Sequence, residues 1–491
     1  RVLRKSANIV GASFEELKEE FDKTANPKFL IAENLSREQL IVLEIRAEEL
    51  KGCEIQTNTI REYVADPALA HVLGYTAKIS PDELTQFSGY AVTDQIGKTG
   101  IEKSYEAELR GSPGKKLLEK DALGRIVREG GEIASEPGNS VVLWLDLELQ
   151  QNLEKALEDT LNRIGAKKAV GIALDPKTGG VLAMVSIPGF DSNLFSQGIS
   201  KAQYEEIASD PLDPFFNRAV SGTYPIGSTI KPLIASAALE EHIIDPDKEL
   251  LTHGYIEIPN EYDPEIVYRF ADNADHGLVD MRDALAVSSN VYFYTIGGGY
   301  EDQQGLGPTR IKDYLLMFGW GAKTGIDLPS EAQGLIPDPA WKKRTKGEGW
   351  WDGDTYLFSI GQGNVLATPL QVVSSFVAIA NGGTLYTPHM VKEIVTKETS
   401  KAIPSHVARG SIISPDNVEV VRDGMRQAVK WGSSVMLNSL PVSSGAKTGT
   451  AQTGRKDREG KDFLFSWVSV FAPYENPEIV LTVMVEDAKE G

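Results

Sequence analysis

A serine and a lysine one helical turn apart could act as a nucleophile and its base. Ser228 and Lys231 lie three positions apart, just before the apolar, alanine-rich run 233–239. Side chains at positions i and i+3 share one face of a helix, so the Lys231 amine can reach the Ser228 oxygen. A serine hydroxyl attacks a carbonyl once a base takes its proton, and a lysine becomes that base where burial or a nearby cation lowers its pKa. The pair therefore indicates acyl transfer through Ser228.

The same S-x-x-K spacing occurs at two other places, so the surrounding sequence has to decide between them. Ser112 to Lys115 runs through Pro113-Gly114, which is typical of a turn, and Ser444 to Lys447 leads into a predicted strand. Only the Ser228 copy opens a predicted helix. Short motifs often match by chance, and the alternative for Lys231 is a surface lysine.

Two further motifs follow Ser228 along the chain. Ser288-Ser289-Asn290 ends the apolar-periodic segment 281–287, and Lys447-Thr448-Gly449-Thr450 precedes two strand-like runs, 463–472 and 478–486. Taken alone, serine and asparagine at a helix end are typical of a cap. K-T-G also occurs at three positions where we predict structural lysines, namely Lys98, Lys177 and Lys323. The order S-x-x-K, S-x-N, K-T-G is the signature of penicillin-binding proteins and serine β-lactamases.

The chain resembles class B penicillin-binding proteins over nearly its whole length, most closely the elongation-type penicillin-binding protein 2. Besides the three motifs, the stretches that carry this resemblance are 71–76, 97–106, 109–111, 319–329, 359–363 and 367–371. The resemblance implies an α+β fold that begins with a mixed α/β pedestal domain. A penicillin-binding, or transpeptidase, domain then follows, in which a five-stranded antiparallel sheet is flanked by helices as in β-lactamases.

The resemblance also implies a role for each serine-site residue in crosslinking peptidoglycan stem peptides. Ser228 is expected to attack the carbonyl of a D-Ala–D-Ala bond and form an acyl-enzyme, while Lys231 takes its proton. Ser288 would pass that proton to the leaving amine, and Asn290 would hold Lys231 and the substrate amide. β-Lactam antibiotics would acylate the same serine.

The K-T-G segment is expected to bind the substrate and to tune the base. Lys447 brings a second cation near the catalytic amine, which helps to keep that amine neutral. Thr448 and Thr450 offer hydroxyls to a substrate carboxylate, and Gly449 leaves room for a substrate along the strand. By family resemblance, the backbone N–H groups of Ser228 and Thr450 form an oxyanion hole.

Composition limits the architecture and the partners. A chain of 491 residues is too long for one ordinary core, so it implies two or more domains. We predict a pedestal domain at 1–138 and a transpeptidase domain at 139–491, divided after Pro137-Gly138. The formal net charge of -20 argues against a nucleic-acid partner, and the single cysteine, Cys53, excludes an internal disulfide.

Hydrophobic periodicity and capping residues predict several elements. Ser36 and Gln39 are typical of a helix start. The predicted elements are helices at 14–21, 37–50 and 147–164, a strand at 141–145, and a hairpin of 169–174 with 181–187.

No run of 18 apolar residues is present, so nothing in this sequence is expected to span a bilayer. The resemblance implies a single N-terminal membrane anchor and a C-terminal helix beyond the sequence given. It places the catalytic domain on the periplasmic side of the cytoplasmic membrane. The partners it implies are a SEDS-type, RodA-like glycosyltransferase and an MreC-like scaffold.

Some relatives hold zinc near the S-x-N motif with Asp and His residues plus a cysteine. Asp272, Asp275 and His276 lie in that neighbourhood, but Ser289 stands where the thiolate would be expected. We predict no metal and no cofactor.

Two alternative functions stay open at this stage. One is a D,D-carboxypeptidase or β-lactamase of the same superfamily, and the other is a non-catalytic lactam sensor or wall scaffold. The segment 158–162 matches the E-x-x-L-N loop that deacylates class A β-lactamases. It precedes Ser228 and lies within a predicted amphipathic helix, so we predict that it is structural. Without a base for hydrolytic water, the acyl-enzyme should persist until an amine arrives, which favours transpeptidation.

Overall fold

The structure is a computed structural model and describes residues 1–23, 29–55, 59–64, 66–91, 93–121, 126–260, 263–456 and 459–489. Its largest sheet has five antiparallel strands in the order β16-β17-β18-β6-β7. These strands are β16 (Gly445–Lys456), β17 (Asp462–Ala472), β18 (Ile479–Ala488), β6 (Lys168–Leu174) and β7 (Val181–Ile187). The predicted α+β fold with its five-stranded sheet is therefore confirmed, and the K-T-G strand β16 lies at an edge.

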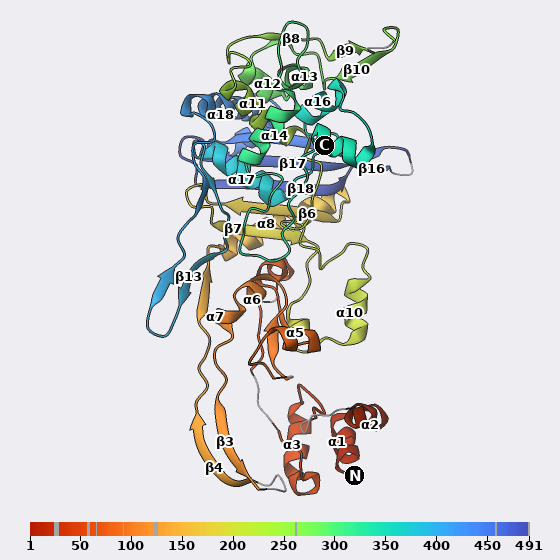
Figure 1. The fold of residues 1–491 in the computed structure, drawn as a ribbon, viewed down its shortest axis with the longest axis vertical. Helices are drawn as coiled ribbons and strands as arrows, with labels where there is room; N and C mark the ends of the chain where they lie inside the picture. The colour runs from red at the N-terminus through yellow and green to blue at the C-terminus, as the bar shows by residue number, and fades with distance from the viewer. Residues whose placement is uncertain are drawn as a thin grey trace.

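Both faces of this sheet are covered by helices, which explains why its strands are so apolar. Along β6, Val170 and Ile172 belong to the main core with α17 (Pro369–Ala380), whereas Ala173 packs with α8 (Leu147–Ile164). This alternation is the period of two that a strand imposes on its side chains. Figure 1 shows α17 and α8 on opposite sides of the sheet. Helix α8 has the predicted bounds.

The helices that carry the first two motifs lie on the α17 side of the sheet, toward the end of the molecule farthest from the N-terminus (Figure 1). They pack into the same core as α17. This helical layer comprises α11 (Lys231–Glu240), α12 (Met281–Val287), α13 (Asn290–Gly298), α14 (Gly307–Met317), α15 (Pro339–Lys346), α16 (Asp352–Ser359) and α18 (Pro415–Lys430). Small sheets border it: β8 (Leu250–Thr252) with β11 (Gly277–Val279), and β9 (Tyr255–Pro259) with β10 (Val267–Ala271).

The N-terminal region extends away from the sheet as a long arm (Figure 1). Helix α3 (Arg37–Ile45) begins at the predicted capping box of Ser36 and Gln39. It ends earlier than predicted, because 47–50 forms a separate 3-10 turn, η1 (Ala47–Leu50). Strand β5 (Ser140–Leu143), which directly follows the arm, pairs with β13 (Val391–Val395), so the end of the arm is tied to the rest of the chain.

The other elements of the arm are α1 (Val2–Val10), α2 (Phe14–Lys23), η2 (Pro67–Leu69), α4 (Ala70–Leu73), β1 (Thr76–Lys78), α5 (Pro81–Gln86), β2 (Gln95–Gly97), α6 (Gly100–Ser104), α7 (Glu106–Leu109), β3 (Lys115–Lys120) and β4 (Ile126–Ile133). Those of the region after the arm are α9 (Asn193–Ser196), α10 (Lys201–Ala208), β12 (Leu385–Tyr386), β14 (Ser400–Ala402), β15 (Val407–Arg409) and η4 (Val435–Ser439). Within the ranges that the structure describes, every helix is too short or too polar to cross a bilayer.

Candidate active site

Ser228 lies on a 3-10 turn, η3 (Gly227–Ile230), that runs directly into α11. The structure thus refines the predicted helix start, and Pro232 supplies the reason. Proline has no N–H to donate to the Ser228 carbonyl, so the Lys231 N–H donates there instead and tightens the turn. Ser228 is half-buried at this start, whereas the Lys231 side chain is fully buried.

The Lys231 amine makes most of the polar contacts of this site. Its Nζ donates to the Ser288 carbonyl oxygen and to Asn290 Oδ1, each at 2.7 Å, and lies 3.3 Å from Ser288 Oγ. Burial, and after it the nearby Lys447 ammonium, lowers the pKa of Lys231 well below that of a free lysine, against an opposing effect of Asp272. A neutral amine has two N–H groups and one lone pair. A neutral Lys231 would donate its two N–H groups to the two oxygens at 2.7 Å, which would leave its lone pair to accept a proton.

The S-x-N motif joins two helices at this amine. Ser288 ends α12 in the left-handed region (φ 60°, ψ 40°), and Asn290 begins α13. A left-handed serine is uncommon and strained. In this conformation its carbonyl and hydroxyl both lie within hydrogen-bond distance of Lys231 Nζ. The cap that we considered for the motif is made by its middle residue, because Ser289 Oγ accepts the Tyr292 N–H at 3.2 Å.

Lys447 reaches the same point from the sheet. Its fully buried Nζ donates to Ser288 Oγ at 2.7 Å and to the Thr448 carbonyl oxygen at 3.0 Å. Ser288 Oγ therefore links the two lysines, and these contacts engage two of the three N–H groups of a Lys447 ammonium. Burial lowers the pKa of Lys447 to about 7. The neighbouring Thr448 is half-buried and Thr450 is exposed.

Strand β16 touches the serine turn through two glycines. A Cβ on Gly449 would lie 2.8 Å from the Ile226 carbonyl oxygen, and one on Gly227 would lie 2.4 Å from the Thr450 carbonyl oxygen. The serine turn thus fills the room that we predicted Gly449 would leave for a substrate. This contact sets the backbones of the Ser228 turn and Thr450 side by side, as an oxyanion hole requires.

Gln362 is a residue of this region to which we assigned no role, although 359–363 carried part of the resemblance. Its Nε2 donates to the Thr450 carbonyl oxygen at 3.3 Å, and the Gly227 N–H donates to the Gly361 carbonyl oxygen at 3.0 Å. The loop at 361–362 therefore contacts both β16 and the serine turn where these two elements meet. A hollow of about 560 Å³ opens beside it, lined by Tyr294, Leu357, Ile360, Gln362, Gly363, Thr450, Ala451, Gln452 and Leu464.

The other three K-T-G copies and the S-x-x-K copy at Ser112 lie outside this site. Lys98 forms an ion pair within the N-terminal arm, and Lys177 and Lys323 are exposed in loops. Ser112 forms an isolated antiparallel β-bridge with Glu136, near the end of the arm. The segment 158–162 is part of α8, which covers the other face of the sheet.

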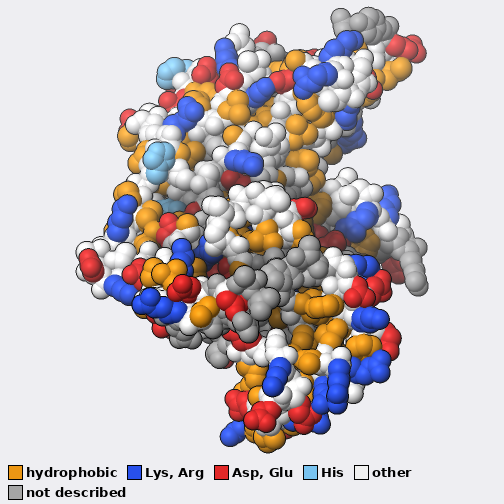
Figure 2. Space-filling view, turned by 60° about the horizontal axis from the view of Figure 1, so that its bottom comes forward, with side chains coloured by type: hydrophobic (Ala, Val, Ile, Leu, Met, Phe, Trp, Pro, Cys, Tyr) orange, Lys and Arg blue, Asp and Glu red, His pale blue; other side chains and the backbone are white. Residues whose placement is uncertain are grey.

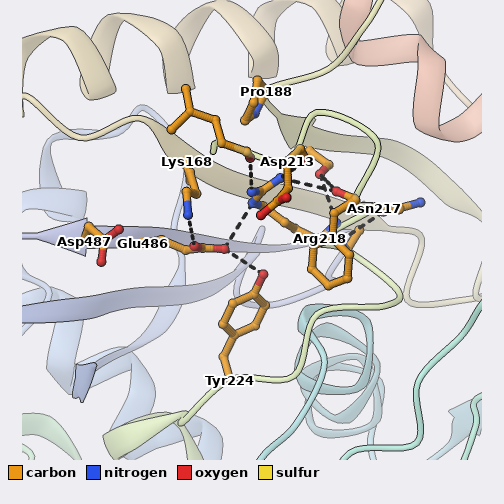
Figure 3. Close-up of polar contacts among 12 residues, drawn as sticks. Lys168, Pro188, Asp213, Asn217, Arg218, Tyr224, Glu486 and Asp487 are labelled. Carbon is orange, nitrogen blue, oxygen red and sulfur yellow. Dashed lines mark hydrogen bonds and ion pairs between the residues drawn. The ribbon is translucent and has the colours of Figure 1, made fainter. Parts of the chain in front are cut away.

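A buried polar cluster that sequence reasoning missed lies ahead of the serine turn (Figure 3). Arg218 is 2% exposed, donates through Nε to Glu486 Oε1 at 3.1 Å, and also donates to three backbone carbonyls. The Tyr224 hydroxyl donates to the same Glu486 oxygen at 2.8 Å, and Lys168 Nζ lies 3.5 Å from the other one. The cluster ties β18 and β6 to the chain that enters the serine turn.

Comparison with known proteins decides the family. Residues 169–491 match the family described as "Penicillin binding protein transpeptidase domain", and residues 1–143 match "Penicillin-binding Protein dimerisation domain". The chain belongs to the penicillin-binding protein transpeptidase family. It therefore carries the catalytic domain of an enzyme, a peptidoglycan transpeptidase.

Individual relatives agree with this penicillin-binding protein assignment. The chain is 35% identical to the "Peptidoglycan D,D-transpeptidase MrdA" of Acinetobacter baumannii over 90% of its own length and 65% of that protein. It is 33% identical to the protein of that name from Escherichia coli, over 93% of this chain and 73% of that one. A solved complex of penicillin-binding protein 2 with MreC from Helicobacter pylori matches with a TM-score of 0.84 and 27% identity, covering 99% of this chain and 88% of that chain.

The zinc-ligand positions of some penicillin-binding protein relatives do not fit a metal in this chain. The Ser289 hydroxyl donates to the Asp272 carboxylate at 2.6 Å, so these two side chains bind each other directly. His276 Nε2 lies 2.7 Å from Asn273 Oδ1, and Asp275 accepts a backbone N–H. Among the described residues, no group of three or more His, Cys, Asp or Glu side chains is arranged to hold a metal ion.

The two buried lysines predict a bell-shaped pH dependence for acylation of this penicillin-binding protein. As pH rises on the acid side, Lys231 loses its proton and becomes a base, so the rate rises. As pH passes through about 7, Lys447 loses the charge that would hold a substrate carboxylate, so the rate falls. The second-order rate constant for a fluorescent penicillin, measured between about pH 5 and about pH 9, checks this shape.

Lys447→Arg is the matched variant for this prediction. A guanidinium keeps its charge throughout the range, so the variant should be slower than the wild type but should lose the alkaline limb. A wild-type rate that still rises at about pH 9 would contradict the assignment of Lys447 as the required cation.

Proposed function

We propose that the chain is a serine D,D-transpeptidase that crosslinks peptidoglycan stem peptides through an acyl-enzyme on Ser228. The observation that carries this proposal is the set of contacts that joins Lys231, Ser288, Asn290 and Lys447 beside the serine turn. A fully buried amine with both N–H groups occupied is a base rather than a surface cation.

Acylation then follows from the contacts of the base. Lys231 takes the hydroxyl proton as Ser228 Oγ bonds to the carbonyl carbon of the D-Ala–D-Ala bond. The oxyanion is stabilised by the N–H groups of Ser228 and Thr450, where one donor typically contributes about 3 kcal/mol to lowering the barrier. The C–N bond breaks as the proton passes from Lys231 through Ser288 Oγ to the leaving amine, and D-alanine departs.

The groups on β16 suit recognition of the terminal carboxylate. Lys447 contributes its charge through the N–H that its contacts to Ser288 and Thr448 do not engage, and the hydroxyls of Thr448 and Thr450 complete the site. Asn290 holds Lys231 through Oδ1, and we assign the amide N–H group that does not donate to Ala271 to the donor peptide. β-Lactams, which carry an acyl carbon and a carboxylate, would acylate Ser228 by the same route.

An amine acceptor completes the reaction by attacking the acyl-enzyme carbonyl and releasing Ser228. The test is incubation with a D-Ala–D-Ala pentapeptide and an amine acceptor, followed by mass spectrometry of the products. We expect an aminolysed product that forms only when the acceptor is present, in an amount equal to that of the D-alanine released. D-Alanine release with only hydrolysed donor, whatever the acceptor, would identify a carboxypeptidase instead.

We further propose that the arm, ending near residue 138, is an interaction domain for an MreC-like scaffold. In the solved Helicobacter pylori complex, MreC is the partner of penicillin-binding protein 2. In this chain the arm exposes large apolar side chains: Phe21, Ile41, Val42, Ile45, Leu117, Leu118, Val127 and Ile133. Figure 2 shows hydrophobic side chains among charges of both signs on the face turned toward the N-terminal end. By resemblance we also propose an anchor in the cytoplasmic membrane, a periplasmic catalytic domain and a RodA-like SEDS glycosyltransferase as partner.

A further inference from the structure

Asp272 follows strand β10 directly and reaches the start of the helix that begins with Asn290. Its own N–H donates to the Gly254 carbonyl oxygen at 2.8 Å, which fixes its backbone beside the β9–β10 hairpin. Its side chain is half-buried. The residue is therefore held from the hairpin side and points its carboxylate at a different element, α13.

One carboxylate accepts three hydrogen bonds at that helix start. Oδ1 accepts the Asn290 N–H at 2.6 Å, and Oδ2 accepts the Ser289 hydroxyl at 2.6 Å and the Val291 N–H at 2.9 Å. Ser289 Oγ in turn accepts the Tyr292 N–H. The first N–H groups of a helix have no acceptor within the helix, so Asp272 and Ser289 together satisfy three of them. The negative charge also suits a helix N-terminus.

These bonds act on the residues that hold the base. Asn290 is gripped twice from the hairpin, through its backbone N–H by Asp272 and through Nδ2, which donates to the Ala271 carbonyl oxygen at 3.4 Å. The other polar atom of its side chain, Oδ1, accepts from Lys231. The adjoining Ser288 offers its carbonyl and hydroxyl to the same amine from a strained left-handed conformation. A strained conformation persists only where its surroundings hold it.

We propose that Asp272 is a positioning residue for catalysis, which clamps the Ser288–Asn290 segment so that its oxygens orient the Lys231 lone pair toward Ser228. This inference rests on the proposed function. In this chain a direct hydrogen bond between the Ser289 hydroxyl and the Asp272 carboxylate lies where some relatives bind a metal ion. The effect is one of geometry, since the charge of Asp272 itself favours the protonated form of Lys231.

The test is Asp272→Asn in the whole chain. An amide has one acceptor oxygen, so at least one of the three bonds is lost and an NH₂ group faces an N–H donor. Small displacements of catalytic groups cost up to about 100-fold, so we expect acylation by a fluorescent penicillin to slow by about 10- to 100-fold. The acid limb of the pH profile should also move to lower pH, because the charge that favours the Lys231 ammonium is gone. This shift reports the lost charge of Asp272, whereas the lower rate at the pH optimum reports the lost hydrogen bonds.

Two further measurements keep the inference falsifiable. Asp146→Asn alters a matched carboxylate cap, on α8 across the sheet, and should leave acylation within about twofold. Ser289→Ala removes one of the three bonds and should slow acylation by about 3- to 10-fold even if Asp272→Asn does not fold. Hydrogen exchange of the first turn of α13 should rise in Asp272→Asn and not in Asp146→Asn. An Asp272→Asn rate within about twofold of wild type would overturn the inference, as would unchanged exchange. Failure of the wild type to be acylated would instead refute the proposed function, and the exchange result would still decide the role of Asp272.

Discussion

Replacing Lys231 by methionine is expected to slow the acylation of Ser228 by a penicillin by about 10³- to 10⁴-fold. Proton transfer by a positioned base contributes up to about 10⁴-fold, and Lys231 is the base that we propose for Ser228. Methionine fills a similar volume and adds no charge, so the change removes the lone pair together with the hydrogen bonds to Ser288 and Asn290. The measurement is the second-order rate constant for a fluorescent penicillin, with the melting temperature recorded in parallel.

Two variants control this experiment. Lys231→Arg keeps a cation but has no lone pair at neutral pH, so it should be as inactive as the methionine variant. Lys177→Met changes an exposed lysine in another K-T-G copy and should match the wild type. If Lys231→Met retained a rate within about tenfold of wild type, Lys231 would not be the base.

Replacing Arg218 by methionine is expected to lower the free energy of unfolding by about 3–5 kcal/mol, the range found when one partner of a buried ion pair is removed. The change leaves the buried Glu486 carboxylate with only the Tyr224 hydroxyl and Lys168, and frees three backbone carbonyls near Phe216. Urea denaturation followed by tryptophan fluorescence measures the loss. The double variant Arg218→Met/Glu486→Gln should recover part of it, because the unpaired charge is then gone.

The matched control is an exposed pair. Lys155 and Asp159 lie one turn apart on α8. The distance from Lys155 Nζ to Asp159 Oδ2 is 3.1 Å, and the side chains are 75% and 67% exposed. Lys155→Met should change stability by less than about 1 kcal/mol. A similarly small effect of Arg218→Met would mean that the cluster of Figure 3 does not hold the chain entering the serine turn.

Local patterns predicted the elements whose packing repeats along the sequence. Leucines at every fourth position predicted α8 at 147–164, and two apolar runs separated by a turn with Pro176 and Gly179 predicted the hairpin of β6 and β7. The three motifs predicted which side chains would meet: Lys231, Ser288, Asn290 and Lys447 do so although they come from three helices and a strand.

Features that depend on distant partners could not be predicted. Arg218 and Glu486 are separated by 268 positions, and neither residue lies in a recognisable motif. Gln362 contacts a backbone carbonyl of another element, and two of the three hydrogen bonds of Asp272 come from backbone N–H groups, which leave no pattern in side-chain types. The 3-10 turn at Ser228 could have been predicted from the sequence, because Pro232 lacks the N–H that an α-helical turn would need.

Ser228 as the nucleophile is tested most directly by mass spectrometry of the intact wild-type chain after incubation with a penicillin, followed by peptide mapping. We predict one penicilloyl group per chain, located on the peptide that contains Ser228, and no adduct on Ser228→Ala. An adduct on any other residue, or an undiminished adduct on Ser228→Ala, would contradict the proposed mechanism.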